Sequence, residues 1–248
     1  MTARTLEGRS ALVTGGSRGI GAGIAARLAA EGARVCVTYV SRPDRADALV
    51  AAITAEGGTA VALQADSADP DAVIDSVRTT AETFGGLDIL VNNAGGGRLD
   101  PIGVATREQI QWILDVNVRA TVLATQEALN HMGEGGRILN IGSVNADRMP
   151  IPGGSAYSMS KGAVAGFTRG LARELAPRKI TVNTLQPGPV DTDLNSASGP
   201  LASEMLRYLA VDRFGTIDEV GALAAFLAGP DAAFITGTAI TIDGGFGA

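Results

Sequence analysis

The chain has 248 residues, of which 46% are hydrophobic and 19% are charged, and its formal net charge is −6. This length supports one large core and is short for two domains with separate machinery, so we expect a single α/β domain over residues 1–248. The negative charge, without a long run of Lys or Arg, argues against nucleic acid as a partner.

Short β-branched runs alternate along the chain with longer segments rich in Ala, Leu and Glu. This pattern predicts repeated βαβ units around a parallel sheet. Three residues have the character of helix N-caps, namely Asp69, Thr106 and Thr216, and the last two begin capping boxes. Seven strands are predicted, near residues 11–14, 34–39, 60–64, 89–91, 137–141, 181–185 and 239–242.

Two predicted helices are unusually long, at about residues 107–131 and 154–176. Both carry polar residues at positions that a purely structural helix fills with Ala or Leu. Residues 188–213 break the alternating pattern, because they are rich in Gly, Pro, Ser and Asp before a group of apolar residues appears. This segment predicts a mobile lid whose inner face is formed by Leu201, Met205, Leu206, Tyr208 and Leu209.

A glycine-rich turn, TGGSRGIG at residues 14–21, follows the first predicted strand and precedes an Ala-rich helix. Its glycines let the backbone turn sharply and approach a pyrophosphate, which free N–H groups and the positive end of the helix dipole would bind. The spacing G-x-x-x-G-x-G differs from the commoner G-x-G-x-x-G. Taken alone, the turn is also compatible with a tight structural connection.

The chain resembles the short-chain dehydrogenase/reductase family through six motifs that occur in order. They are TGGSRGIG at 14–21, Asp66 after the third strand, NNAG at 92–95, Asn117 in the long helix, Ser143 with YSMSK at 157–161, and PGPVDT at 187–192. The resemblance runs from the first strand to the last residues. It implies a doubly wound, seven-stranded parallel sheet with helices on both faces, an NADP(H) or NAD(H) cofactor, and a homotetramer.

The resemblance also implies a catalytic set of Asn117, Ser143, Tyr157 and Lys161. Tyr157 and Lys161 are four residues apart on a predicted helix, so an ammonium lies beside a phenol and favours the phenolate. We expect Tyr157 to donate the proton to a carbonyl oxygen during reduction. By resemblance, Ser143 would orient the same oxygen, and Asn117 would hold a water that relays protons to Lys161.

Cofactor contacts are assigned by the resemblance along much of the chain. Asp66 would contact the adenine amino group, residues 93–95 the adenosine ribose and pyrophosphate, and residues 187–192 the nicotinamide carboxamide. NNAG and the C-terminal IDGG are expected to be partly architectural. The full predicted set is Gly15, Ser17, Arg18, Gly19, Ile20, Gly21, Tyr39, Ser41, Arg42, Asp66, Ser67, Asn93, Ala94, Gly95, Tyr157, Lys161, Pro187, Gly188, Val190 and Thr192.

The end of the second strand, VTYVSRPD, predicts NADP(H) rather than NAD(H). NAD-selective proteins of this architecture place a carboxylate there, and residues 39–41 carry none. Arg42 follows, and Arg18 lies in the glycine turn across the same space, so two guanidiniums could hold the 2′-phosphate. The alternatives are that Arg18 stacks on adenine or faces solvent and that Arg42 pairs with Asp44. We expect Arg18 to contribute more.

The substrate is less well defined by the sequence. The lid and the loops after Gly95 and Ser143 suggest a pocket for a moderately hydrophobic ketone, and we favour solvated positions for Arg98 and Arg148 over a role in that pocket. The chain is similar to 3-oxoacyl-carrier-protein reductases, but its segment NHMGEGGR is mildly acidic where those enzymes present basic residues. GSVNADRMP, LARELAPR, QPGPVDTD and IDGGFGA resemble a bacterial subgroup that includes a cyclic-di-GMP-binding biofilm-dispersal protein.

The predicted function is therefore NADPH-dependent reduction of a ketone to a secondary alcohol. A cyclic-di-GMP-binding protein and a 3-oxoacyl-carrier-protein reductase are the alternatives. A serine-hydrolase reading of Ser143 lacks both a G-x-S-x-G elbow and a plausible histidine base, because His131 lies at a predicted helix end and fits a capping role.

The remaining expectations concern environment and assembly. One His and one Cys argue against a zinc site, and Cys36 in an apolar run fits a core position and a reducing compartment. No apolar N-terminal segment or membrane span is evident, so we expect a cytoplasmic protein. The long helices and the last strand are expected to form the tetramer interfaces, with Trp112 and Leu114 as candidate contacts. Burial within the subunit is the equal alternative for Trp112.

Overall fold

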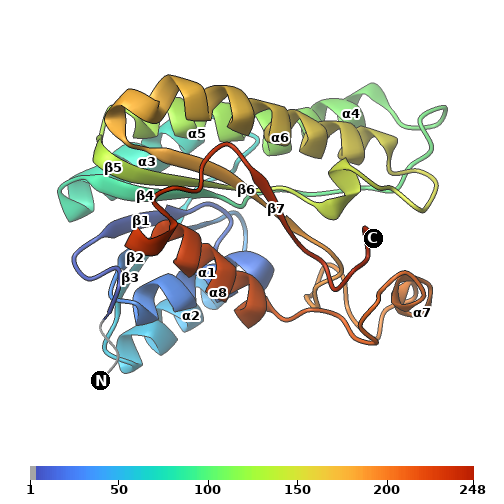
Figure 1. The fold of residues 1–248 in the computed structure, drawn as a ribbon, viewed down its shortest axis with the longest axis horizontal. Helices are drawn as coiled ribbons and strands as arrows, with labels where there is room; N and C mark the ends of the chain where they lie inside the picture. The colour runs from blue at the N-terminus through green and yellow to red at the C-terminus, as the bar shows by residue number, and fades with distance from the viewer. Residues whose placement is uncertain (1–3) are drawn as a thin grey trace.

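A computed structural model describes residues 4–248 of the chain. Seven parallel strands form one sheet in the order β3-β2-β1-β4-β5-β6-β7 (Figure 1). The strands are β1 (Ser10–Val13), β2 (Arg34–Tyr39), β3 (Thr59–Gln64), β4 (Leu87–Asn92), β5 (Met132–Ile141), β6 (Thr181–Pro187) and β7 (Ala239–Ile242). The strand order reverses at β1, which pairs with β2 on one side and β4 on the other, and open α/β sheets bind ligands at such a reversal.

Helices cover both faces of the sheet, which confirms the predicted doubly wound fold (Figure 1). Helices α1 and α8 pack against each other on one face with α2 beside α1, whereas α3, α5 and α6 lie on the other face. The helices are α1 (Gly19–Ala30), α2 (Pro43–Ala55), α3 (Pro70–Phe84), α4 (Arg107–Leu114), α5 (Ala120–Ala128), α6 (Ser155–Leu175), α7 (Ala202–Leu206) and α8 (Ile217–Ala228).

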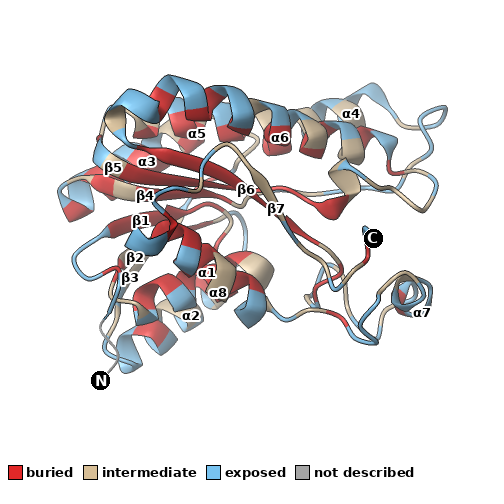
Figure 2. Cartoon of the chain, viewed as in Figure 1, coloured by how far each residue is buried: buried red, intermediate tan, exposed pale blue. Residues whose placement is uncertain are grey.

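Each face of the sheet has its own apolar core. One core joins α1 and α8 to the sheet through residues such as Leu28, Leu227 and Val13, and the other joins α3, α5 and α6 through residues such as Val77 and Leu90. Every residue of β1 is buried, as expected for a parallel strand covered on both sides (Figure 2). Cys36 fills a core position as predicted, and burial raises the pKa of its thiol to about 11.

The predicted helix starts are present, because each depends on local hydrogen bonds. The Asp69 carboxylate accepts a 3.0 Å hydrogen bond from the Asp71 amide at the start of α3. Thr106 and Thr216 begin α4 and α8 with reciprocal capping boxes. No helix between residues 4 and 248 is both long enough and apolar enough to cross a bilayer.

The first long helix was predicted wrongly as a single continuous helix over residues 107–131. The chain forms α4, then a π-helical turn at Asp115–Arg119, then α5, which ends at Ala128. The glycines after Met132 disfavour helix, so that segment joins β5 and extends this strand beyond its predicted start at residue 137. His131 lies outside the helix and bonds the Glu127 carboxylate at 3.0 Å, rather than capping a helix end.

Candidate functional site

The predicted catalytic residues come together at the carboxyl ends of β4 and β5. Ser143 follows β5, Tyr157 and Lys161 lie in the first turns of α6, and Asn117 lies in the π-helical turn between α4 and α5. A π-helical turn changes the direction of the side chains that follow it and is frequent at functional sites. Three separate segments of the sequence thus contribute to one region.

Ser143 is fixed by the turn that it begins. Its hydroxyl accepts a 3.1 Å hydrogen bond from the Asn145 amide and caps a short 3₁₀ turn over Val144–Ala146. The Ser158 hydroxyl donates to the Asn145 carbonyl at 2.6 Å and so ties this turn to α6 next to Tyr157. The loop after β5 therefore holds Ser143 against the helix that carries the phenol.

The Tyr157 phenol is partly buried, and this burial raises its pKa, while the nearby Ser143 hydroxyl opposes that shift. This differs from the expectation that the neighbouring ammonium dominates and favours the phenolate. The Lys161 Nζ atom lies 5.8 Å from the centre of the phenol ring. In the cofactor-free chain, Tyr157 is a protonated phenol at neutral pH, which is the form that can donate a proton.

Lys161 is buried and has a specific backbone partner. Its Nζ donates a 2.8 Å hydrogen bond to the Ile141 carbonyl at the end of β5. Because burial disfavours the ammonium, the pKa of Lys161 falls to about 8. The bond to Ile141, at the end of the buried strand β5, therefore holds the ammonium near the phenol.

The Asn117 side chain makes three hydrogen bonds to protein groups. Its Oδ1 accepts from the Gly96 amide at 2.9 Å, and its Nδ2 donates to the Gly96 carbonyl and the Ser160 hydroxyl, each at 2.9 Å. Both ends of this side chain are thus bonded to protein groups. The predicted water relay to Lys161 stays a prediction, and the observed role is to fix the loop that follows β4.

The loop over residues 95–97 covers the predicted catalytic residues closely. A Cβ on Gly95 would lie 3.0 Å from Asn117 Oδ1, and a Cβ on Gly97 would lie 2.9 Å from Tyr157 Cδ2. Gly96 packs directly against the Trp112 ring, although this ring is 42% exposed, so the indole contacts its own subunit. Three consecutive glycines thus let this backbone lie close to the side chains of Asn117, Trp112 and Tyr157, and larger residues would prevent such close contact.

The glycine turn after β1 has the expected backbone. Gly15 and Gly19 have φ values of 60° and 54°, which favour glycine, and the Gly15 amide donates to Thr38 Oγ1 at 2.8 Å. The side-chain Nδ2 of Asn93 donates to the carbonyls of Thr14 and Gly15 at 2.9 and 3.0 Å. The Asn93 side chain is therefore committed to shaping this turn, which supports the architectural part of the NNAG prediction.

The amino-terminal end of α1 fits a phosphate group. Arg18 occupies the N-cap position without a side-chain capping bond, whereas Asp69, Thr106 and Thr216 cap α3, α4 and α8. The first turn of α1 thus presents backbone N–H groups that no side chain caps, together with the positive end of the helix dipole. The methyl group of Thr192 lies beside Gly19, so the PGPVDT segment approaches the same end of the helix.

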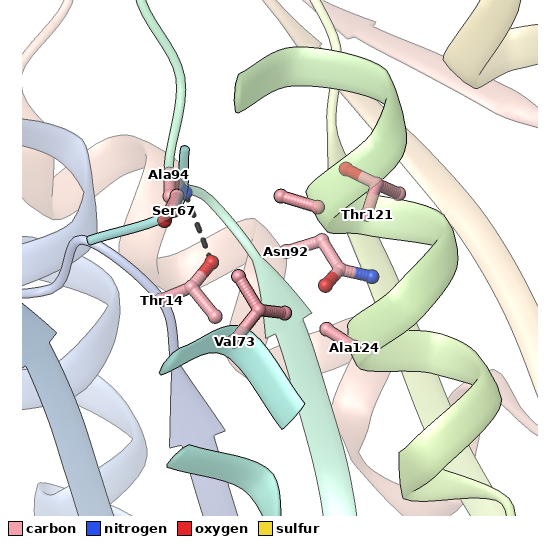
Figure 3. Close-up of a pocket in the computed structure, with 8 residues that line it drawn as sticks. Thr14, Ser67, Val73, Asn92, Ala94, Thr121 and Ala124 are labelled. Atoms are coloured by element: carbon pink, nitrogen blue, oxygen red, sulfur yellow. Dashed lines mark hydrogen bonds between the residues drawn. The ribbon is translucent and has the colours of Figure 1, made fainter. Parts of the chain in front are cut away.

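A small pocket lies at the reversal of strand order, beside the ends of β1 and β4 (Figure 3). The Ala94 amide donates to Thr14 Oγ1 at 3.0 Å across its rim. The volume is about 10 Å³, the scale of one water molecule, so a nucleotide could not enter it without rearrangement. It is lined by Thr14, Ser67, Val73, Asn92, Ala94, Ala120, Thr121 and Ala124.

The other predicted adenosine contacts lie near the carboxyl ends of β2 and β3. Tyr39 ends β2, while Ser41 is exposed in the turn that follows. Asp66 is exposed, and its carboxylate accepts a 2.9 Å hydrogen bond from the Ala68 amide. These residues are open to a ligand at one edge of the sheet.

Five charged residues surround the predicted 2′-phosphate position. Arg42 makes two hydrogen bonds to Asp44, at 2.9 and 2.6 Å, which is the alternative that the sequence left open. Arg45 pairs with Asp193 at the start of the lid, a contact that the sequence analysis missed. Arg18 is exposed, and the neighbouring arginines, Arg45 foremost, lower the pKa of Asp193.

The predicted nicotinamide contacts lie where β6 leaves the sheet. Pro187 ends β6, and the Gly188 amide donates to the Ile242 carbonyl of the adjacent strand at 3.0 Å. Val190 forms a bridge with Gly215, and Thr192 opens the turn to Asn195. The lid after this segment contains one short helix, α7, and its Leu201 and Leu206 are more than one-third exposed.

Arg98 and Arg148 have different surroundings. Arg98 is exposed and bonds Asp100 at 2.8 Å, in line with the favoured solvated position. For Arg148 that expectation was wrong, because its guanidinium donates to the carbonyls of Phe246 and Ala248 and lies over the Tyr208 ring. The partners of Arg148 lie far along the chain, so no local sequence signal marks them.

Comparisons with known proteins show which family the chain resembles along nearly its whole length. A profile of the family described as enoyl-(acyl carrier protein) reductase matches residues 15–247. The chain is 48% identical to the cyclic-di-GMP-binding biofilm dispersal mediator protein of Escherichia coli K12, over 97% of this chain and 98% of that protein. It is 42% identical to the 3-oxoacyl-[acyl-carrier-protein] reductase of Synechocystis, over 99% and 98% of the two chains.

Among solved structures, the chain is similar to a short-chain dehydrogenase from Burkholderia cenocepacia that was determined in complex with NADP. The TM-score is 0.97 and the identity is 53%, with coverage of 98% of this chain and 100% of that one. Sequence, fold and the placement of the six motifs therefore lead to the same family. The chain belongs to the short-chain dehydrogenase/reductase family.

Proposed function

We propose that the protein reduces a ketone or related carbonyl to a secondary alcohol with NADPH. The observation that carries this proposal is the convergence of Ser143, Tyr157 and Lys161 at one end of the sheet, with the Ser143 hydroxyl near the phenol and the Lys161 Nζ bonded to the Ile141 carbonyl. The similar Burkholderia dehydrogenase binds NADP, and the uncapped end of α1 in this chain fits a pyrophosphate. A binding protein alone would not require the Ser143, Tyr157 and Lys161 set.

The residues divide the chemistry among them. NADPH, when bound, supplies the hydride. Ser143 would hydrogen-bond the carbonyl oxygen, and Tyr157 would donate a proton to it. Lys161 would stabilise the phenolate that remains and hold the nicotinamide ribose. Reduction is favoured where Tyr157 is protonated, and its raised pKa keeps it protonated at neutral pH.

The experiment that tests the proposal is NADPH oxidation by the purified protein with a panel of small and moderately hydrophobic ketones. Product stereochemistry and rate are read out together. A 3-oxoacyl thioester offered free and on a carrier protein tests the reductase alternative. Absence of turnover with every carbonyl would refute the proposal.

A cyclic-di-GMP-binding role is the second candidate, and it is favoured by the 48% identity to the Escherichia coli mediator protein. Calorimetry with cyclic-di-GMP distinguishes the two candidates, because a reductase does not require that nucleotide. Binding together with ketone turnover would assign both properties to the chain.

We expect the protein to prefer NADPH over NADH, with Arg18 contributing more than Arg42. Arg18 is exposed near Asp193, and its side chain makes no hydrogen bond or ion pair within residues 4–248, whereas Arg42 must leave Asp44 before it can hold a phosphate. Arg18→Ala should lower the ratio of kcat/KM for NADPH over NADH by about tenfold or more, because a charged hydrogen bond contributes roughly 1.5–3 kcal/mol. Arg42→Ala should lower it less.

The control for cofactor preference is Arg27→Ala, which removes the same charge from an exposed ion pair with Glu31 on α1. Steady-state constants for both cofactors are measured in all four proteins. A wild type that prefers NADH, or a preference that neither Arg18→Ala nor Arg42→Ala changes, would contradict this assignment.

We also propose a homotetramer in the cytoplasm. Exposed apolar side chains support the assembly. Trp112, Val122 and Met159 lie on α4, α5 and α6, whereas Phe226 lies on α8 and the fully exposed Phe234 precedes β7. Light scattering at micromolar protein should give a mass near four subunits, and a monomer would refute the assembly without touching the chemistry.

A further inference from the structure

The last residues of the chain form a turn that contacts the lid. In this C-terminal turn, residues 243–248, the Asp243 carboxylate accepts hydrogen bonds from the amides of Gly245 and Gly247 at 3.0 and 2.7 Å. The Gly244 carbonyl accepts from the Ala210 and Val211 amides of the lid at 2.9 and 3.1 Å. The chain end thus lies between α7 and the rest of the molecule (Figure 1).

The packing between the turn and the lid is close. A Cβ on Gly244 would lie 2.6 Å from Val211 Cγ2, and a Cβ on Gly245 would lie 2.5 Å from Ala210 Cβ. The buried Phe246 ring meets the Tyr208 ring edge to face, with centroids 5.7 Å apart. The part of the lid that follows α7 therefore rests on the C-terminal turn.

Arg148 connects this contact to the loop that begins at Ser143. Its amide donates to the Val144 carbonyl at 3.0 Å, at the end of the turn that Ser143 caps. Its Nη1 donates to the carbonyls of Phe246 and Ala248 at 2.5 and 3.1 Å, and its guanidinium lies 5.7 Å from the centre of the Tyr208 ring. One side chain thus touches the C-terminal turn and the lid while anchored beside Ser143.

We propose that Arg148 is a positioning residue for the carbonyl substrate, acting through the C-terminal turn and Tyr208 on the lid. The role rests on the proposed reductase function. A planar guanidinium can stack on an aromatic ring while it donates hydrogen bonds, whereas an ammonium is a point charge that does not stack in this way. Arg148 holds lid residues 208–211 in one place, so the substrate does not have to order them on binding.

The effect should be specific to substrate affinity. Among the described residues, no recorded contact of the Arg148 side chain reaches the glycine turn, Tyr157 or Lys161. Arg148→Ala should therefore raise KM for the ketone about tenfold while kcat and the Kd for NADPH stay within about twofold. Hydrogen exchange at the Ala210 and Val211 amides should accelerate, because their acceptor loses its support.

Two further variants separate positioning from general damage to the fold. Arg148→Lys should recover part of the KM, because it keeps the charge and one donor. Phe246→Ala should raise KM as Arg148→Ala does, and the double variant should be little worse than either single variant, because both remove the same support. Arg27→Ala, which also removes one arginine from an exposed ion pair, should change neither KM nor the exchange of the lid amides.

Hydrogen exchange keeps this test independent of turnover. If hydrogen exchange at the Ala210 and Val211 amides is unchanged in Arg148→Ala, the claim that Arg148 supports the lid is wrong, whether or not any carbonyl is reduced. Faster exchange with an unchanged KM would overturn the role in substrate positioning. If the wild type reduces no carbonyl, the reductase proposal fails, and with it the substrate role, while exchange still decides whether Arg148 holds the lid.

Discussion

Tyr157→Phe should remove nearly all turnover while leaving the fold and NADPH binding intact. The change deletes only the phenol oxygen, which is the proposed proton donor and lies near the Ser143 hydroxyl. General acid catalysis contributes typically 10²–10⁴-fold, so we expect kcat to fall by about that factor. Turnover is measured with the best ketone of the panel, and NADPH binding by the change in cofactor fluorescence.

The result is interpretable only if the variant is folded and binds cofactor. Thermal unfolding and the NADPH Kd should stay close to wild type, because the phenyl ring keeps its packing under the loop at Gly97. Activity within about tenfold of wild type, which corresponds to only about 1.4 kcal/mol of barrier, would remove Tyr157 from its assigned role.

Features set by nearby residues could be predicted from the sequence. The capping boxes at Thr106 and Thr216 depend on a side chain three residues away. Tyr157 and Lys161 share a helix face because four residues complete about one helical turn. The seven strands and the parallel sheet follow from the alternation of apolar runs with longer helical segments, whereas the doubly wound arrangement was implied by the family resemblance.

Features that depend on distant contacts could not be predicted in this way. Arg148 bonds carbonyls 98 and 100 residues further along the chain, and Asn93 bonds Thr14 across 79 residues. The π-helical turn at Asp115–Arg119 lies in a stretch without Gly or Pro to mark a break, so the sequence favoured one continuous helix. The amide of Asn117 could be expected at the site, but its bonds to Gly96 depend on that turn.

Electrostatics of the buried pair also depended on the packed structure. Spacing alone predicts that an ammonium lowers the pKa of a neighbouring phenol. In the folded chain, burial outweighs this effect of the ammonium. Burial raises the pKa of the Tyr157 phenol and lowers the pKa of Lys161, because it disfavours the charged form of both groups. The site therefore holds a neutral phenol beside a lysine that is costly to keep charged.

Lys161→Met should abolish turnover and at the same time stabilise the cofactor-free protein at neutral pH. Burial lowers the pKa of Lys161 from 10.5 to about 8, which corresponds to about 3 kcal/mol of cost to the folded state while the ammonium is charged. Met keeps most of the side-chain volume but removes the charged hydrogen bond to Ile141, which offsets roughly 1.5–3 kcal/mol. We expect a net gain of up to about 1.5 kcal/mol in the free energy of unfolding.

The stability difference between Lys161→Met and the wild type should depend on pH, because the pKa of Lys161 is lower in the folded chain than in the unfolded chain. Between about pH 8 and pH 10.5 the unfolded chain binds more protons at Lys161 than the folded chain, so the wild type gains stability as pH rises through that window. Below pH 8 the cost is complete, so the advantage of Lys161→Met should be greatest there and should shrink by pH 10. Urea unfolding at the two pH values measures the difference.

The matched control is the other lysine of the chain. Lys179 is exposed and pairs with Glu134, which raises the pKa of its ammonium, so Lys179→Met should leave stability close to that of the wild type at neutral pH. If Lys161→Met were less stable than the wild type below pH 8, the claim that the buried Lys161 ammonium destabilises the folded chain would be wrong. A gain that appears together with lost turnover would instead mean that the fold accepts a destabilising charge because the reaction requires it.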